Sequence, residues 1–270
     1  MPEGISPSRR RYLEHMRRRL RLTHLARIML LVIFFAAWEI AAGCGAIDPF
    51  IFSSPGRILR TFTSMLAGGD LLLHAGTSIA ETAAGFLLGT AAGTVIAILL
   101  WWSPFLSRVL DPYLVVLNAL PKTALGPIFI VWMGAGPGSI IAMTLAISLI
   151  VTILDMHNGF SETDVEKLRL MRTFGASRMQ ILFKLVLPSN FSTMINALKV
   201  NVGLSWVGVI MGEFLVSKAG LGYLIVYGSQ VFKMDLVMTT VLILAAAAAV
   251  MYRGVLWLEK ALKKYIGVTV

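Results

Sequence analysis

The residues of this sequence that could do chemistry are polar side chains set within or beside long apolar stretches. They are Asn118, Lys122, Asn201, Ser205, Trp206 and Glu213. Burying such groups in hydrocarbon is costly, so they commonly face a bundle interior or a water path. Lys122 could attract an anion, or it could snorkel or pair with Asp111 or Glu81. Glu213 could face a pathway mouth or be paired structurally, and the remaining residues could line the same path or serve as polar contacts between helices.

No constellation for nucleotide, metal or covalent chemistry accompanies these residues. The glycine cluster from Gly134 to Pro137 lacks the Lys-Ser/Thr pair and the preceding strand of a phosphate loop. The single cysteine, Cys44, excludes an internal disulfide and a cysteine-based metal cluster. The histidines lack metal-ligand spacing, so we expect no catalytic, cofactor-binding or metal site in this chain.

Composition indicates a polytopic membrane protein. Of the 270 residues, 57% are hydrophobic and 14% are charged, whereas soluble domains carry about 25% charged residues. A bilayer span takes about 20 apolar residues. We expect six spans, at about 28–46, 75–101, 109–133, 138–157, 190–214 and 234–256. The fold class is therefore all-α, with the third span interrupted by Pro121 and Pro127 and the second able to approach a neighbour closely through Gly85, Gly89 and Gly93.

The distribution of lysine and arginine predicts the orientation. With the N-terminus inside, eighteen of these residues fall in cytoplasmic segments and four fall outside. The positive-inside rule then places both termini and the loop 158–189 in the cytoplasm. The basic segment 1–27 is expected to lie as a short helix on anionic lipid, and the tail 259–270 is cytoplasmic. Because an apolar span follows the basic segment at once, a nucleic-acid partner is not expected.

The stretch from Ser161 to Pro188 is the longest polar interruption between apolar segments. Its pattern predicts one helix from Asp164 to Phe174 and a second from Ser177 to Leu185, separated by Gly175. Leu168, Met171 and Phe174 are expected on one face, and Met179, Leu182 and Leu185 are expected to face the same way. Such a face could bind a protein partner, or it could lie on the membrane or pack on the chain's own helices.

The same stretch resembles the permease signature of ABC importers, which reads Glu-Ala-Ala, three residues, Gly, nine residues, then Ile-x-Leu-Pro. Gly175 takes the glycine and Leu185 to Pro188 take the last element, but Arg169-Leu170-Met171 stand in place of Glu-Ala-Ala. The resemblance implies that this loop couples to an ATPase. The implied coupling residues are Leu168, Arg169, Leu170, Met171, Arg172, Phe174, Gly175, Ala176, Ser177, Arg178 and Pro188.

Further elements resemble the nitrate, sulfonate and taurine type of inner-membrane permease. They include Ser53-Ser54-Pro55, His74 to Ser78, Leu120-Pro121-Lys122, and Gly212-Glu213 followed by Gly220 to Ile225. On its own pattern, the last of these reads as a re-entrant or gating turn, or as a plain loop. The resemblance implies a type I ABC importer permease fold over 74–258, preceded by a first transmembrane helix and outer loop over 28–73.

The resemblance also implies partners and a location in the cell inner membrane. The partners would be a second permease subunit, expected to be an identical copy, an ATPase dimer that holds ATP and magnesium, and an extracytoplasmic substrate-binding protein. The implied substrate is a small anion such as nitrate, a sulfonate or taurine. A permease for a neutral or cationic molecule, such as a pyrimidine thiamin precursor, and a secondary transporter remain alternatives. A secondary transporter would need inverted repeats and an ion-coupling site, and a membrane scaffold is a third reading.

Overall fold

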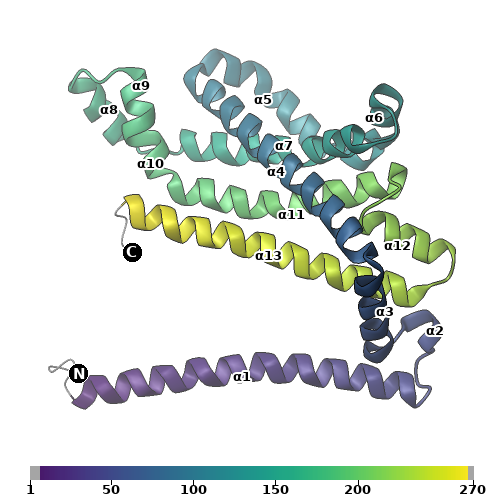
Figure 1. The fold of residues 1–270 in the computed structure, drawn as a ribbon. Coiled ribbons are helices and arrows are strands. Elements are labelled where there is room, and N and C mark those ends of the chain that lie inside the picture. The colour runs from purple at the N-terminus through teal and green to yellow at the C-terminus, as the bar shows by residue number, and fades with distance from the viewer. Residues whose placement is uncertain (1–6, 267–270) are drawn as a thin grey trace.

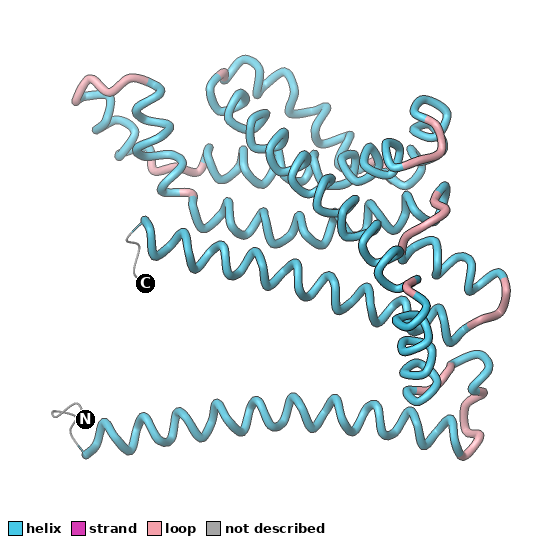
Figure 2. Tube along the Cα trace, in the orientation of Figure 1, coloured by secondary structure: helices cyan, strands magenta, loops and turns pink. Residues whose placement is uncertain are grey.

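The protein is helical throughout the part of the chain that is described. The computed structural model describes residues 7–266, and no strand lies among them (Figures 1 and 2). The long helices are α1 (Pro7–Gly43), α4 (Asp70–Trp102), α7 (Pro137–Ser161), α11 (Phe191–Val216) and α13 (Met234–Ile266). The shorter elements are α2 (Pro49–Phe52), α3 (Pro55–Gly68), α5 (Pro104–Ala119), η1 (Lys122–Leu125), α6 (Gly126–Met133), α8 (Val165–Thr173), α9 (Arg178–Ile181), η2 (Leu182–Val186), α10 (Leu187–Ser189) and α12 (Leu221–Gln230).

Five of the described helices are long and apolar enough to cross a membrane, and a bent pair makes a sixth candidate span. The pair is α5 with the η1–α6 segment, and its axis turns by 90° at the break. Leu120, before the break, is extended, with φ −61° and ψ 136°, as expected for a residue that precedes proline. The expectation of about six spans is confirmed, with the third one broken where Pro121 interrupts it.

The centre of the fold is a close packing of α4, α7 and α11 (Figure 1). Gly85, Gly89 and Gly93 of α4 face Thr144, Ser148 and Thr152 of α7, in that order. A Cβ atom added to Gly89 would stand 2.6 Å from the Ser148 hydroxyl oxygen. The predicted small-residue face is therefore the contact face, and it lets the backbone of α4 approach α7 with only small side chains of α7 between them.

The first helix differs from the prediction. The basic segment was expected to form a short, separate surface helix, but α1 runs without a break from Pro7 to Gly43. No glycine or proline interrupts residues 8–42, so nothing in the chain stops the helix at the predicted boundary of 27. Only 6% of the apolar part of α1 is buried within the protein. Residues 1–6 and 267–270 of the predicted cytoplasmic termini lie outside the described residues, as do the side chains of Arg9, Arg10, Arg11, Arg17 and Lys264.

The last helix also extends beyond its predicted span, 234–256. The segment α13 continues to Ile266, through most of the expected tail. On this extension the carboxylate of Glu259 accepts from Lys199 of α11 at 2.8 Å and from Lys263 at 2.9 Å. The ion pair of Lys199 therefore ties α11 to the end of α13.

Candidate coupling and translocation sites

The loop between α7 and α11 folds into a helical hairpin, formed by α8, α9, η2 and α10. Asp164 caps α8, because its carboxylate accepts from the backbone N–H of Glu166 at 2.9 Å. This hydrogen bond holds the pKa of the Asp164 carboxyl below its usual range, with a smaller contribution from Lys167. Ser177 and Gln180 form a capping box at the start of α9. The predicted helices, Asp164–Phe174 and Ser177–Leu185, match these elements closely.

Gly175 makes the turn between the two arms of the hairpin. Its φ is +74°, a left-handed conformation that glycine adopts without steric cost. The turn closes α8 through two backbone hydrogen bonds, from the N–H of Gly175 to the carbonyl of Arg172 at 2.9 Å and from the N–H of Ala176 to that of Met171 at 3.0 Å. This pairing is the Schellman pattern that ends many helices.

The base of the hairpin is closed by a buried pair of side chains. Asn190, which follows α10, donates its amide N–H to the hydroxyl of Thr163 at 2.8 Å. Thr163 lies just before α8, so the bond joins the two ends of the segment. Asn190 also donates to the carbonyl of Val186 in η2 at 2.9 Å. Through η2 and α10 the hairpin continues directly into α11.

The two faces of the hairpin have different surroundings. Leu168, Met171 and Ala176 pack against a core that includes Phe160, and Leu182 is part of that core. The other predicted coupling residues are exposed: Arg169, Leu170, Arg172, Phe174, Gly175, Ser177, Arg178 and Pro188.

The predicted common apolar face is wrong for Phe174, which is 77% exposed. Six residues at about 100° each place Phe174 about 240° around the helix from Leu168. It shares a side with Leu170 instead, which is 55% exposed. Met179 is also exposed, whereas Leu182 is buried and Leu185 half-buried.

Lys122 and Asn118 meet at the break between α5 and η1. The Nζ of Lys122 donates to the carbonyl of Asn118 at 2.7 Å and contacts its Oδ1 at 3.3 Å. Among the described residues, neither Asp111 nor Glu81 forms an ion pair with this lysine. Lys122 thus provides a hydrogen-bond donor for a backbone carbonyl at the C-terminal end of α5. Neither Asp111 nor Glu81 neutralises its charge.

Asn201, Ser205 and Trp206 lie buried between helices of the chain itself. The amide of Asn201 donates to the hydroxyl of Thr90 on α4 at 2.6 Å, and Trp206 packs in a core cluster with Val202, Leu221 and others. Asn201 and Trp206 therefore join α11 to its neighbours, whereas the buried hydroxyl of Ser205 has no hydrogen-bond partner among the described residues. The structure does not bring these three residues to the break at Lys122.

Glu213 is the centre of a buried polar cluster. The side chain is 1% exposed. Its Oε1 accepts from the Ser78 hydroxyl at 2.5 Å and its Oε2 from the N–H of Gly222 at 2.5 Å. The Ser78 oxygen in turn accepts from the N–H of Leu221 at 2.7 Å, and Nδ1 of His74 accepts from the N–H of Gly220 at 3.0 Å. The cluster joins α4 and α11 to the start of α12.

The segment that was expected to be a re-entrant turn or a plain loop is instead the first turn of α12. Its free N–H groups, which a helix start always leaves, are satisfied by Glu213, Ser78 and His74. The sequence interpretation missed Ser78 and His74 as members of this cluster, although their spacing of four residues on one helix face was a usable signal.

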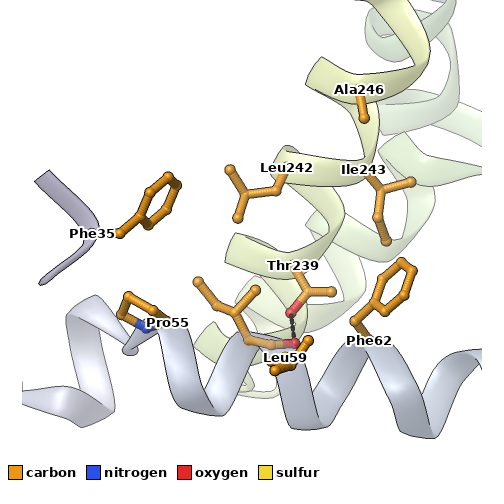
Figure 3. A pocket seen from close by; sticks show the side chains of 9 residues that line it. Phe35, Pro55, Leu59, Phe62, Thr239, Leu242, Ile243 and Ala246 are labelled. Carbon is orange, nitrogen blue, oxygen red and sulfur yellow. Dashed lines mark hydrogen bonds between the residues drawn. The ribbon is translucent and has the colours of Figure 1, made fainter. Parts of the chain in front are cut away.

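An apolar groove between α1, α3 and α13 is the hollow drawn in Figure 3, with a volume of about 380 Å³. Its lining residues are Phe35, Pro55, Ile58, Leu59, Phe62, Thr239, Leu242, Ile243 and Ala246. The hydroxyl of Thr239 already donates to the carbonyl of Asp235 at 2.6 Å. With no free polar group in its described lining, the groove offers an ion or polar solute no hydrogen bond.

Comparison with solved structures supports the fold. The inward-facing MetNI methionine ABC transporter matches with a TM-score of 0.52, covering 66% of this chain and 92% of that chain at 20% identity. The fold is therefore that of a type I ABC importer permease.

Two curated relatives match over most of their length. A putative aliphatic sulfonates transport permease protein of Bacillus subtilis is 27% identical over 238 residues, which are 88% of this chain and 86% of that protein. A formylaminopyrimidine transport permease protein of Halalkalibacterium halodurans is 29% identical over 196 residues, 73% of this chain and 76% of that protein.

A family model matches residues 85–264, which include the broken span, the hairpin and α11 to α13. Together with the apolar helices, this match shows a multi-pass protein of the membrane transport class. The chain belongs to the family of binding-protein-dependent transport system inner membrane components.

Proposed function

We propose that this chain is the permease subunit of an ATP-driven importer, and that the hairpin between Ser161 and Pro188 docks on a separate ATPase subunit. The observation that carries the proposal is the exposure of Phe174 and Leu170 beside a structured glycine turn. Large apolar side chains held outward on a fixed turn are typical of a partner surface. Both chain termini and the hairpin would lie on the cytoplasmic side of the inner membrane, where most of the Lys and Arg residues are counted.

The two faces of the hairpin would have separate tasks. Arg169, Leu170 and Phe174 would contact the ATPase, while Leu168 and Met171, packed on the core, would pass movement to the spanning helices. ATP would close the ATPase dimer and shift the permease between inward- and outward-open states. Because Arg169 replaces the usual glutamate, the cognate ATPase should offer an acidic or apolar spot there.

Replacing Phe174 by aspartate is expected to abolish copurification of the ATPase with this chain. The aspartate would place a charge where the proposal buries an aromatic ring, and central aromatic contacts commonly contribute 2 kcal/mol or more, roughly 30-fold in affinity. Phe232→Asp is the matched control, because Phe232 is 70% exposed but lies between α12 and α13, outside the hairpin. The measurement is ATPase recovered per unit of tagged permease from membranes.

Two results would count against the docking role. One is equal ATPase recovery with Phe174→Asp and with the unchanged chain. The other is equal loss in Phe174→Asp and Phe232→Asp, which would mean that a charge at any exposed aromatic position weakens the complex.

The translocation path would run between this chain and a second, identical copy, along α5 and the break at Lys122. No residue of α5 is buried within the chain, so this helix has a face free for the path or for the second copy. The 16 residues of α5 extend about 24 Å, short of the roughly 30 Å of hydrocarbon. The break would therefore fall within the depth of the membrane, which is allowed where it lines a cavity.

A small anion such as a sulfonate, taurine or nitrate is the proposed substrate. Lys122 supplies a cation that neither Asp111 nor Glu81 neutralises, and the Bacillus subtilis relative is named for aliphatic sulfonates. The Halalkalibacterium halodurans relative, named for formylaminopyrimidine, favours a neutral pyrimidine as the second candidate.

Replacing Lys122 by glutamine is expected to lower uptake of an alkanesulfonate about 10- to 100-fold, since a hydrogen bond to a charged group contributes roughly 1.5–3 kcal/mol. Uptake would be measured in vesicles that contain the complete importer. Lys233→Gln, a change of an exposed lysine outside the spans, is the control and should leave uptake unchanged. Uptake of a formylaminopyrimidine that is unaffected by Lys122→Gln, with no uptake of sulfonates by either form, would select the second candidate.

A further inference from the structure

Two neighbouring cavities lie where the end of α4 meets the hairpin. One has a volume of about 310 Å³ and is lined by Ile98, Leu99, Trp102, Met179, Leu182 and Phe183, all apolar. The other, of about 130 Å³, is lined by Trp101, Trp102, Pro104, Leu168, Arg172, Arg178 and Ile181. Trp102 lines both, so the apolar cavity lies next to the one that contains the arginines.

The smaller cavity has positive charges that the chain does not neutralise. Arg178 donates from Nη1 to the carbonyl of Trp102 at 3.1 Å, which fixes the guanidinium and leaves its other N–H groups available. Arg172 forms no ion pair with any carboxylate in the described part of the chain.

No carboxylate is among the described residues that line either cavity. A guanidinium can hold a phosphate with two parallel hydrogen bonds. The charge of the smaller cavity is therefore complementary to a phosphate group.

The position of the two cavities relative to the membrane separates a lipid from a soluble anion. Tryptophan gathers at the membrane–water interface, and Trp101 and Trp102 end the apolar span of α4. The arginines then lie at the level of lipid headgroups, and the apolar cavity lies deeper. Its rim is open, with Leu99 52% and Phe183 59% exposed. A free phosphate would use the arginines alone and leave the apolar cavity unfilled.

We propose that this junction binds one anionic phospholipid. Its phosphate contacts Arg172 and Arg178, and one acyl chain lies along Leu99 and Phe183. The lipid fills the space between α4 and the inner face of α8, on the side opposite Leu170 and Phe174. The site does not depend on the proposed ATPase docking, but a lipid there would support the hairpin from behind.

The test uses the full chain, purified in a zwitterionic detergent and titrated with phosphatidylglycerol, with phosphatidylcholine, or with inorganic phosphate. Bound lipid is counted by native mass spectrometry. Phosphatidylglycerol is expected to bind at least tenfold more tightly than phosphatidylcholine, and inorganic phosphate is expected not to displace it at millimolar concentration.

Two variants examine the two halves of the site. Arg172→Gln is expected to weaken phosphatidylglycerol at least tenfold, whereas Arg169→Gln, an exposed arginine on the same helix that lines neither cavity, is the control and should leave binding unchanged. Leu99→Trp, which narrows the apolar cavity, is expected to weaken the lipid but not any binding of inorganic phosphate.

Equal binding of the two lipids would overturn the proposal, as would unchanged phosphatidylglycerol binding in Arg172→Gln. Efficient competition by inorganic phosphate, together with no effect of Leu99→Trp, would show that the arginines bind a soluble anion and would also overturn it. Because Arg172 makes no side-chain hydrogen bond among those found in the described chain, its replacement is not expected to unfold the hairpin, and circular dichroism checks this.

Discussion

Replacement of Gly175 by valine is expected to abolish ATP-coupled uptake while the chain stays folded in the membrane. The φ of +74° at Gly175 costs a β-branched residue about 1–3 kcal/mol. The turn is held by two backbone hydrogen bonds and the following capping box, so a cost of this size is enough to displace it. Phe174 and Leu170 would then be displaced from the positions in which we propose that they contact the ATPase.

A matched control exists elsewhere in the chain. Gly45 has a φ of +76°, and at neither glycine would an added Cβ meet another atom within 4 Å. Gly45→Val therefore carries the same backbone cost at the link between α1 and α2, far from the hairpin. Uptake and membrane abundance would be measured for both variants. Normal uptake in Gly175→Val would show that this turn has no coupling role. Equal losses of uptake in both variants would show that the effect of Gly175→Val is general destabilisation.

Replacement of Glu213 by alanine is expected to cause a large loss of stability. It would leave the Ser78 hydroxyl and the N–H of Gly222 without partners, in a site from which water is excluded. Each orphaned buried donor costs about 1–3 kcal/mol. The start of α12 would lose its attachment to α11, and we expect little folded protein in the membrane. Glu213→Gln retains one acceptor oxygen and should lose about half as much.

Glu39 provides the control for burial. Its carboxylate also accepts from a backbone N–H, that of Gly56, at 2.8 Å, but the residue is exposed, unlike Glu213, which is 1% exposed. Glu39→Ala is therefore expected to cost less than about 1 kcal/mol. The measurement is the thermal unfolding midpoint in one detergent. If Glu213→Ala unfolds no earlier than Glu39→Ala, the buried cluster does not hold α12 in place.

The spans and the hairpin could be predicted from the sequence because both depend on short-range signals. Apolar length decides where a helix can cross a membrane, and Gly175 between two amphipathic stretches marks the turn of the hairpin. The four-residue spacing of Gly85, Gly89 and Gly93 likewise predicts a close contact between α4 and another helix. The coupling and pathway roles assigned to particular residues remain predictions.

The residues that meet across the fold could not be found in the same way. Ser78 and Glu213 are 135 positions apart in sequence, and periodicity does not pair residues at that distance. The six polar residues proposed for one path separate into the pair at the break, the three buried residues of α11 and the cluster at Glu213, because the orientation of α11 is set by its packing on α4 and α7. Phe174 was predicted on the face of Leu168, but six residues at about 100° each place the two on different sides of the helix.

The bond between Asn190 and Thr163 has a mechanical consequence. A segment that is fixed at only one end would deform locally when a force acts on it. Here Asn190 and Thr163 hold the two ends of the hairpin together at 2.8 Å, and Asn190 is the one residue that separates α10 from α11. If the hairpin docks on an ATPase as proposed, a displacement at the glycine turn would therefore be transmitted to α11 and not absorbed within the hairpin.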